Sequence, residues 1–317
     1  MVDTDLQNLA HTRARKRAGF STYFKKNYSL YVLLIPALVY YLVFKYVPMY
    51  GVVVAFKDYN IFQGVLASPW AGLDNFRDMI SLPNFLGVVR NTLMLSGLSL
   101  IIGFPVPIIL SLMLNELRYA KLKKAVQSVL YIPHFMSWIV LSGIIINLLS
   151  PQYGFVNNVL RSLGLDPVFF MAREGWWVVT YVASNIWQSA GWQTIIFMAA
   201  LSGIDPTLYE VAIVDGANRW QLAWRITIPS ILPTIVIMFI LRVGRIVTVG
   251  FEQPMALYNA LVADVAEVIS TFIYHVGVQQ GRFALTTAIG LAESFVNLLM
   301  ILAANYLAKK VGEEGLF

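Results

Sequence analysis

Six long apolar stretches, separated by polar connections, constrain the fold of this chain more than any other feature. A membrane-spanning helix needs roughly 20 mostly apolar residues, and each stretch is close to that length. Only helices and closed barrels satisfy their backbone hydrogen bonds inside a bilayer. The sequence therefore predicts an all-α integral membrane protein with six transmembrane helices. The predicted spans are Leu30–Val47, Thr92–Leu114, Val126–Leu149, Val178–Ser202, Ile228–Gly250 and Phe283–Ala308.

The composition agrees with this class and excludes several kinds of site. Hydrophobic residues make up 58% of the chain and charged residues 13%, whereas a soluble domain carries about 25% charged residues. The absence of cysteine excludes disulfides, thiolate metal sites and thiol nucleophiles. His11, His134 and His275 lack the spacing of metal ligands, so no metal site is expected. No nucleophile–base pair or His–Glu metal motif is present, and we expect no enzyme activity in this chain alone.

The distribution of lysine and arginine predicts the orientation. With the N-terminus inside, fourteen of the 23 basic residues fall in cytoplasmic segments and five in the outer loops 48–91, 150–177 and 251–282. Because cytoplasmic loops carry the excess of basic residues, both termini are predicted to be cytoplasmic. The net charge of +6 then reflects topology and contact with membrane lipids, not nucleic acid.

The same pattern divides the chain into three parts. They are a basic N-terminal tail (1–28), a transmembrane domain (29–310) and a short C-terminal tail (311–317). No small-residue cleavage site follows the first apolar stretch, so this stretch is expected to remain as a helix. The first outer loop is rich in aromatic and turn residues, which favours a small folded cap.

One polar connection, EVAIVDGANRWQLAWRITIPSILP at 210–233, has strong local order. The Asp-Pro pair at 205–206 suits a helix start, and Gly216 breaks the run. Asn218 could cap a second short helix that ends at Arg225. We expect a helix–glycine–helix element at the cytoplasmic surface, and a solvated loop with interfacial helices is the simpler alternative.

The spacing Glu-x-Ala-x₃-Gly-x₉-Ile-x-Ile-Pro in this connection resembles the signature loop of permease subunits of binding-protein-dependent ABC importers. Val211 stands where the family usually has alanine, and Ile228 where it usually has leucine. Four further stretches, YVPMYGVVVAFKDYN, VGFEQPMALYNALV, DVAEVISTFIYHVGV and EEGLF, are similar to the oligo- and polysaccharide branch of these permeases, which includes membrane subunits of alginate importers. The loop positions that match, and that we expect to couple to an ATPase, include Glu210, Ala212, Asp215, Gly216, Ala217 and Pro229.

The resemblance implies the fold, the partners and the mechanism. It implies a type I ABC importer permease with cytoplasmic coupling helices at 205–229, in the inner membrane of a prokaryote. The implied partners are a second homologous permease, two ATPase subunits that bind ATP and Mg, and an extracytoplasmic solute-binding protein that delivers the carbohydrate. Glu210 would contact the ATPase, Gly216 would set the bend, and Ala212 and Ala217 would permit close approach. This chain has no Gly-x₄-Gly-Lys-Ser/Thr phosphate loop, so it cannot hydrolyse ATP alone.

Polar residues within the spans suggest where a substrate passes. Two explanations fit the polar and aromatic residues of the fourth span: hydrogen bonding and packing between helices, or the lining of a substrate pathway. These residues are Asn185, Gln188, Trp192 and Gln193. Ionisable groups at this depth usually face the bundle interior, so Arg242, Arg245 and Glu293 form either a structural pair or a site for an anionic sugar. A self-contained channel or secondary transporter is the alternative function, although the chain lacks the midplane acids of an ion-coupled carrier.

Overall fold

The structure is a computed structural model that describes residues 27–310, so the predicted terminal tails lie mostly outside it. The described residues are helical and contain no β-strand, only an isolated bridge between Lys57 and Trp70. The elements are α3 (Tyr28–Tyr41), η1 (Leu42–Tyr46), α4 (Val47–Met49), η2 (Tyr50–Phe56), α5 (Gly64–Ala67), α6 (Asp74–Ser81), α7 (Phe85–Ile101), α8 (Pro105–Glu116), α9 (Ala120–Tyr131), η3 (Ile132–Phe135), α10 (Trp138–Leu149), α11 (Phe155–Ser162), α12 (Glu174–Ser202), α13 (Pro206–Val214), α14 (Arg219–Leu222), η4 (Ala223–Thr227), α15 (Ile228–Val243), α16 (Glu252–Leu257), η5 (Ala260–Val262), α17 (Ala263–Ala266), α18 (Ile269–Ile273), η6 (Tyr274–Gln279) and α19 (Phe283–Lys310). The all-α membrane fold is confirmed.

Four helical stretches of the described chain are long and apolar enough to cross a membrane. They are Tyr28–Phe56, Phe85–Glu116, Arg219–Val243 and Phe283–Lys310. Three bent helix pairs, at 120–149, 174–214 and 260–279, also pass when each is taken as one span. The last pair lies in a segment that the sequence assigned to an outer loop.

The third predicted span, Val126–Leu149, lies in a bent helix pair and is not one continuous helix. The chain turns by 106° between η3 and α10. Pro133 has no N–H to continue the helical ladder, and Ser137 starts a new helix by accepting the Val140 N–H at 3.4 Å. The fifth predicted span is also displaced, because its helix begins at Arg219 and ends at Val243.

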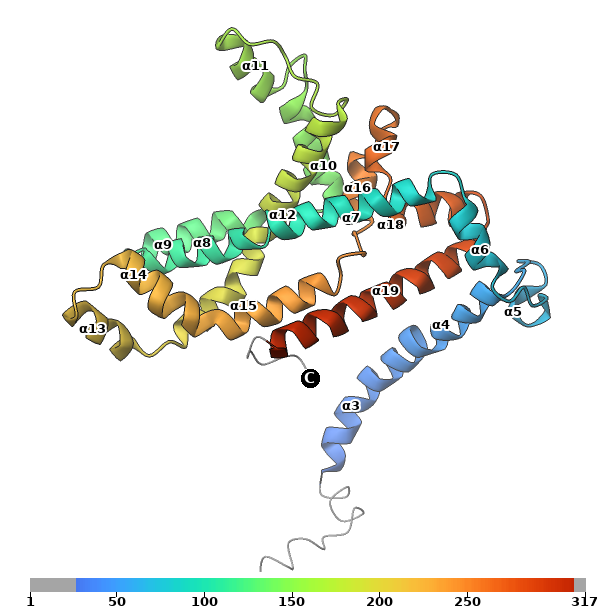
Figure 1. The fold of residues 1–317 in the computed structure, drawn as a ribbon, viewed down its shortest axis with the longest axis horizontal. Helices are drawn as coiled ribbons and strands as arrows, with labels where there is room; N and C mark the ends of the chain where they lie inside the picture. The colour runs from blue at the N-terminus through green and yellow to red at the C-terminus, as the bar shows by residue number, and fades with distance from the viewer. Residues whose placement is uncertain (1–26, 311–317) are drawn as a thin grey trace, which may run out of the picture. The chain divides into compact units, whose positions relative to one another are not determined.

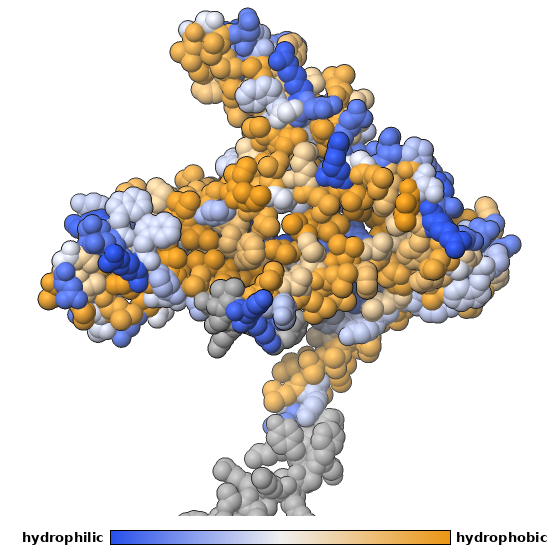
Figure 2. Space-filling view, in the orientation of Figure 1, coloured by the Kyte–Doolittle hydropathy of each residue, from blue (hydrophilic) through white to orange (hydrophobic). Residues whose placement is uncertain are grey.

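The chain divides into two compact units, residues 1–53 and 54–317. In the first unit, helix α3 buries none of its residues, and Tyr40 packs against the rings of Tyr41 and Phe44. In the second unit, α12 contacts α7, α8, α9, α15 and α16, and α15 lies beside α19 (Figure 1). Figure 2 shows a mostly apolar surface in the middle of this unit, with polar side chains towards α14 and α6. Such an apolar middle suits contact with lipid.

The predicted cap between the first two spans is a folded segment built around one lysine. Lys57 is 6% exposed, and its ammonium donates to the carbonyls of Val65, Leu66 and Ser68 at 2.6, 3.1 and 3.1 Å. These carbonyls lie at the end of α5, where a cation satisfies free acceptors and the helix dipole. The prediction of a folded cap is confirmed.

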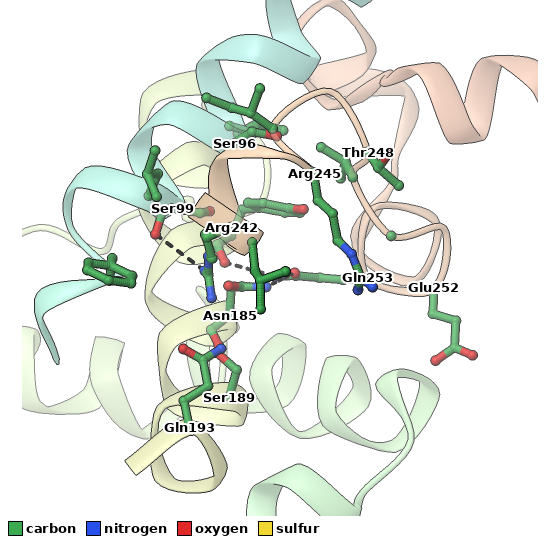
Figure 3. A pocket seen from close by; sticks show the side chains of 18 of the residues that line it. Ser96, Ser99, Asn185, Ser189, Gln193, Arg242, Arg245, Thr248, Glu252 and Gln253 are labelled. Atoms are coloured by element: carbon green, nitrogen blue, oxygen red, sulfur yellow. Dashed lines mark hydrogen bonds between the residues drawn. The ribbon is translucent and has the colours of Figure 1, made fainter. Parts of the chain in front are cut away.

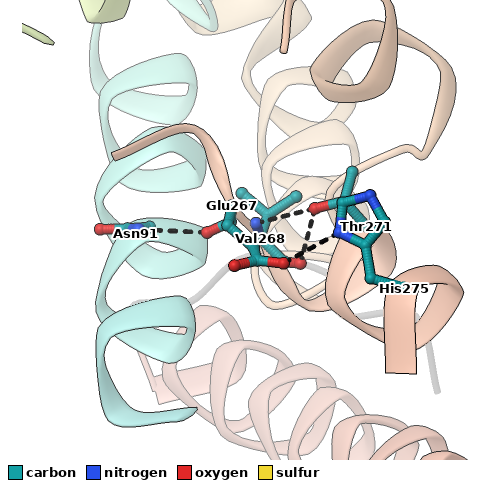
Figure 4. A network of polar contacts seen from close by, with 5 residues as sticks. All are labelled: Asn91, Glu267, Val268, Thr271 and His275. Carbon is teal, nitrogen blue, oxygen red and sulfur yellow. Dashed lines mark hydrogen bonds and ion pairs between the residues drawn. The ribbon is translucent and has the colours of Figure 1, made fainter. Parts of the chain in front are cut away.

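Buried polar side chains of α7 hold the segment that follows α16 (Figure 4). Asn91 Nδ2 donates to the carbonyls of Asp264 and Glu267 at 2.8 and 3.1 Å. The Thr92 hydroxyl accepts the Ile269 N–H at 3.0 Å, and the Glu267 carboxylate contacts His275 Nδ1 at 3.0 Å. These bonds close the break in the 260–279 helix pair against the straight helix α7.

Replacing Asn91 with leucine is expected to lower the free energy of unfolding by about 2 kcal/mol, because two buried carbonyls lose their donor. Thermal unfolding of the protein in nanodiscs would measure the loss. Asn147→Leu is the matched control, since Asn147 is exposed, its Nδ2 donates within its own helix to Gly143 at 2.9 Å, and its oxygen meets only the exposed Tyr153 hydroxyl at 3.5 Å. Equal melting temperatures for the two variants would contradict the role assigned to Asn91.

Candidate functional site

The connection between α12 and α15 begins with a well-capped helix. Asp205 Oδ1 accepts the Thr207 N–H at 2.9 Å, and Pro206 occupies the first helical position of α13. The Thr207 hydrogen bonds lower the pKa of the Asp205 carboxyl below its ordinary value. Because the pKa of Asp205 is lower in the folded state, the stability that the cap contributes is fully present above the unfolded pKa. This stability is lost as the pH falls through the folded pKa. The predicted helix start is confirmed.

A Schellman motif centred on Gly216 closes the C-terminal end of helix α13. Gly216 has φ +83°, its N–H donates to the Ile213 carbonyl at 3.0 Å, and the Ala217 N–H donates to Ala212 at 2.9 Å. A Cβ on Gly216 would meet nothing within 4 Å. Glycine is therefore required here for its backbone angle, and not for space.

The second helix of the connection continues into the fifth span. Asn218 and Gln221 form a reciprocal capping box at its start, with bonds of 2.9 and 2.8 Å. Instead of ending at Arg225, as the sequence predicted, α14 runs through the π-turn η4 into α15. Pro229 lies inside this continuous stretch, directly after the π-turn, where the helical hydrogen-bond register changes.

Two side-chain contacts attach the connection to the helices around it. The Tyr209 hydroxyl of α13 lies 3.0 Å from the hydroxyl of Thr227, which is buried at the end of η4, directly before α15. Arg219 pairs with Glu116, at the end of α8, at 3.0 Å. The ion pair is exposed and contributes little stability, but both contacts fix how α13 and α14 lie against the spans.

The outward face of α13 combines apolar side chains with an acid. Val211 and Val214 are 62% and 87% exposed. Glu210 is exposed and forms no ion pair with any described residue. Exposed apolar side chains on an ordered helix of a membrane protein are a candidate surface for a partner or for lipid. Asp215 is also exposed, while Ala212 and Ala217 are partly buried.

A cavity of about 880 Å³ lies in the second unit among α7, α12, α15 and the segment before α16 (Figure 3). One stripe of α12, spaced by four residues, forms a wall of it. The stripe consists of Tyr181, Asn185, Ser189, Gln193 and Phe197. The other polar lining residues are Ser96, Ser99, Arg242, Arg245, Thr248, Glu252 and Gln253. A cavity of this size and mixed chemistry is suited to a ligand.

Both predicted arginines line the cavity without an acidic partner among the described residues. Arg242 Nη2 donates to the Ser99 carbonyl at 3.4 Å, and Arg245 lies on the turn just past the end of α15. The predicted alternative of a structural pair with Glu293 is wrong, because Glu293 Oε1 accepts the Thr248 hydroxyl at 2.7 Å and Glu293 forms no ion pair with Arg242, Arg245 or any other residue within 27–310. The cavity lining therefore holds two guanidinium groups that form no ion pair with a described residue, together with one acid, Glu252.

The fourth-span residues divide between two faces. Asn185 and Gln193 line the cavity, as the pathway interpretation requires. Gln188 does not, since its amide lies 3.5 Å from the His134 carbonyl. Trp192 stacks on the His134 ring with centroids 4.7 Å apart. For Gln188 and Trp192, interhelical packing is the better explanation.

Gln253, which no pattern in the sequence singled out, organises one side of the cavity. Its oxygen accepts the Asn185 amide at 2.8 Å, and its nitrogen donates to the Tyr181 carbonyl at 2.8 Å. Gln253 is 4% exposed. The stretch VGFEQPMALYNALV that supported the resemblance contains it, but no periodicity marks a lone glutamine. Among residues 27–310 no cluster of His, Asp and Glu could hold a metal ion.

Comparison with known proteins places these features in a family. The family described as "Binding-protein-dependent transport system inner membrane component" matches residues 93–313. The polygalacturonan/rhamnogalacturonan transport system permease protein YteP of Bacillus subtilis (strain 168) is 44% identical over 288 residues, which cover 91% of this chain and 90% of the relative.

Solved structures agree with the relatives. A chain of a bacterial alginate ABC transporter, crystallised with an alginate pentasaccharide-bound periplasmic protein, is 41% identical with a TM-score of 0.85. The match covers 94% of this chain and 99% of that chain. A chain of a bacterial ABC transporter that imports the acidic polysaccharide alginate is 42% identical, with a TM-score of 0.84 over 92% and 98% of the two chains.

Gly216→Ala is expected to destabilise the end of α13 by about 1–2 kcal/mol, the cost of a left-handed backbone for an L-residue. Gly216→Asn should lose less, because asparagine tolerates that region. Hydrogen exchange of the Ala217 amide would measure the loss of the Schellman bond. The control is Gly175→Ala, at an unstrained and open position. Unchanged protection in Gly216→Ala would contradict the requirement for φ +83°.

Proposed function

Since this chain belongs to the inner-membrane components of binding-protein-dependent transport systems, as a permease subunit of an ABC importer, we propose that its cargo is an acidic oligosaccharide. The relatives named above transport polygalacturonan or rhamnogalacturonan and alginate, which are polymers rich in carboxylates. The cavity supports the same chemistry here, because it combines two arginines with amides, hydroxyls and aromatic rings. An arginine fork matches a carboxylate in a bidentate manner.

The proposed assembly contains this chain, a second homologous permease and two ATPase subunits, which would hold ATP and Mg. A solute-binding protein would deliver the oligosaccharide. The importer would lie in the inner membrane with both termini of this chain cytoplasmic, and 205–229 would face the ATPase. The basic ends of α9 and α19 support that orientation, since Lys121, Lys123, Lys124, Lys309 and Lys310 lie on the side expected to be cytoplasmic.

One observation carries the mechanism: a single helical stretch joins the connecting loop to the cavity. Arg219 begins this 25-residue stretch beside the capping box, and Arg242 lies near its other end, in the cavity wall. At 1.5 Å per residue the stretch is roughly 37 Å long. A displacement of the loop by the ATPase would therefore move Arg242 directly, because a continuous helix transmits displacement that a flexible loop would absorb.

Alternating access follows from this linkage. In one state the two arginines and the α12 stripe would bind the oligosaccharide. A tilt of α15 would then change the distance between the arginines and the stripe, and the oligosaccharide would be released. Glu210 is proposed to anchor α13 to the ATPase, with Asp215 nearby and Ala212 and Ala217 close to the contact. A self-contained channel or carrier, the alternative function, would leave the ordered and exposed α13 face without a purpose.

Glu210→Ala is expected to abolish stimulation of ATP hydrolysis by the loaded binding protein, because the loop loses its polar contact with the ATPase. The reconstituted importer should keep its normal melting temperature. Glu174→Ala, at the opposite end of α12, is the control acid and should leave stimulation unchanged. Normal stimulation in Glu210→Ala would argue against this residue as the coupling contact.

Arg242→Gln and Arg245→Gln are each expected to lower transport of an oligouronate by about 10- to 100-fold, since a hydrogen bond to a charged group is worth about 1.5–3 kcal/mol. Uptake of the carboxyl-reduced oligosaccharide should fall much less. The control is Arg77→Gln on α6, which is exposed and outside the cavity. Equal losses for acidic and reduced sugars would show that the arginines do not recognise charge.

A further inference from the structure

A second polar set lies on one stripe of α19. Glu293, Asn297 and Ile301 are four residues apart, so they share a face of that helix. All three contact the turn between α15 and α16, residues 244–248. We refer to these three residues as the α19 clamp.

The polar contacts of the clamp form a closed network on the turn. The Thr248 hydroxyl donates to Glu293 Oε1 at 2.7 Å, and Asn297 Nδ2 donates to Thr248 Oγ1 at 2.7 Å. Asn297 Oδ1 accepts the Val247 N–H at 3.3 Å. Because the threonine oxygen is donor to one partner and acceptor from the other, its rotation and the position of the turn are both set.

Packing holds the same turn from two further directions. A Cβ added to Gly244 would overlap the side chain of Ile301, so the backbone lies directly against α19. Val247 is 6% exposed and belongs to the core cluster that contains Ile289 and Ile269. The turn is therefore fixed by α19 and by the core at the same time.

The turn presents Arg245 to the cavity. Arg245 and Thr248 both line it, and Figure 3 shows the Arg245 side chain extending towards Gln253. Within residues 27–310 the Arg245 guanidinium makes no hydrogen bond or ion pair. Its direction therefore depends on the backbone that carries it, where the Arg245 N–H bonds to Arg242 and the Thr248 N–H to Arg245.

We propose that the α19 clamp is a positioning element for substrate selectivity, which orients the 244–248 turn so that Arg245 meets the carboxylates of the cargo. Apolar packing alone would seat the turn, but it would not fix its rotation, whereas hydrogen bonds are directional. Polar groups in a membrane span usually mark such a role. This inference rests on the proposed function of the cavity.

A double-mutant cycle on the complete importer in nanodiscs tests the clamp. Equilibrium binding of an oligouronate is measured, without binding protein, for Thr248→Val, Arg245→Gln and the double variant. Each single change is expected to raise the Kd about tenfold, as for the loss of one hydrogen-bonded contact. The double variant should bind no more weakly than Arg245→Gln, because Thr248 acts through Arg245.

Conservative variants separate positioning from general stability. Thr248→Ser keeps the hydroxyl and Glu293→Gln keeps an acceptor, so both should bind like the wild type. Glu293→Leu should behave like Thr248→Val. The control is Ser294→Val, since the Ser294 hydroxyl bonds only within its own helix, to Gly290 at 2.8 Å.

Two outcomes would overturn the clamp, and they differ in what they say of the cavity. If the increases in Kd of the two single variants multiply in the double variant, the clamp is rejected. It is also rejected if Thr248→Val binds like the wild type while Arg245→Gln binds more weakly. Both outcomes leave the proposed role of Arg245 in the cavity intact. Wild-type binding by all three variants would reject both the clamp and the proposed recognition of carboxylates.

Discussion

Several irregular segments of the described residues are held by side-chain donors, most of them buried, that bond to backbone carbonyls. Inside a bilayer an unpaired carbonyl has no water to bond to, so irregular backbone persists only where protein satisfies it. Each of five such donors bonds carbonyls of a different segment, and they are Lys57, Asn91, Asn157, Gln253 and Asn259. Asn91 in this way holds the break of the 260–279 helix pair, and Gln253 holds one wall of the cavity.

The same principle explains why the connecting loop suits the transmission of force. Its helix ends are closed locally, by Asp205, by the Schellman bonds at Gly216 and by the Asn218 capping box. Helix ends whose backbone N–H and C=O groups are hydrogen-bonded within the loop resist fraying when a partner displaces the loop. The π-turn before Pro229 then passes the helix into the span without a break, so the second half of the loop and the α15 wall of the cavity lie on one continuous helical stretch.

The charge of the cavity depends on the hydrogen-bond partner of one carboxylate, that of Glu293. Glu293 bonds to Thr248 and not to an arginine, so both guanidinium groups remain uncompensated by the described residues. Glu252 is the one acid in the lining, so the lining keeps an excess of positive charge, as the proposed recognition of an acidic cargo requires. The amide pair of Asn185 and Gln253 adds orientation, because its geometry is fixed by the Tyr181 carbonyl.

The sequence alone determined the class of the protein, most span positions, the starts of both helices in the connecting loop and the glycine that follows the first of them. These features depend on hydropathy over about 20 residues and on caps that act within three or four positions, so they are readable locally. Tertiary structure alone decided that Glu293 bonds Thr248, that Gln253 meets Asn185, and that Gln188 and Trp192 face His134 instead of the cavity. Those pairs are separated by 45, 68 and 54 residues or more. Which polar groups meet across such distances is set by how the helices cross, and hydropathy and capping signals carry no information about that crossing.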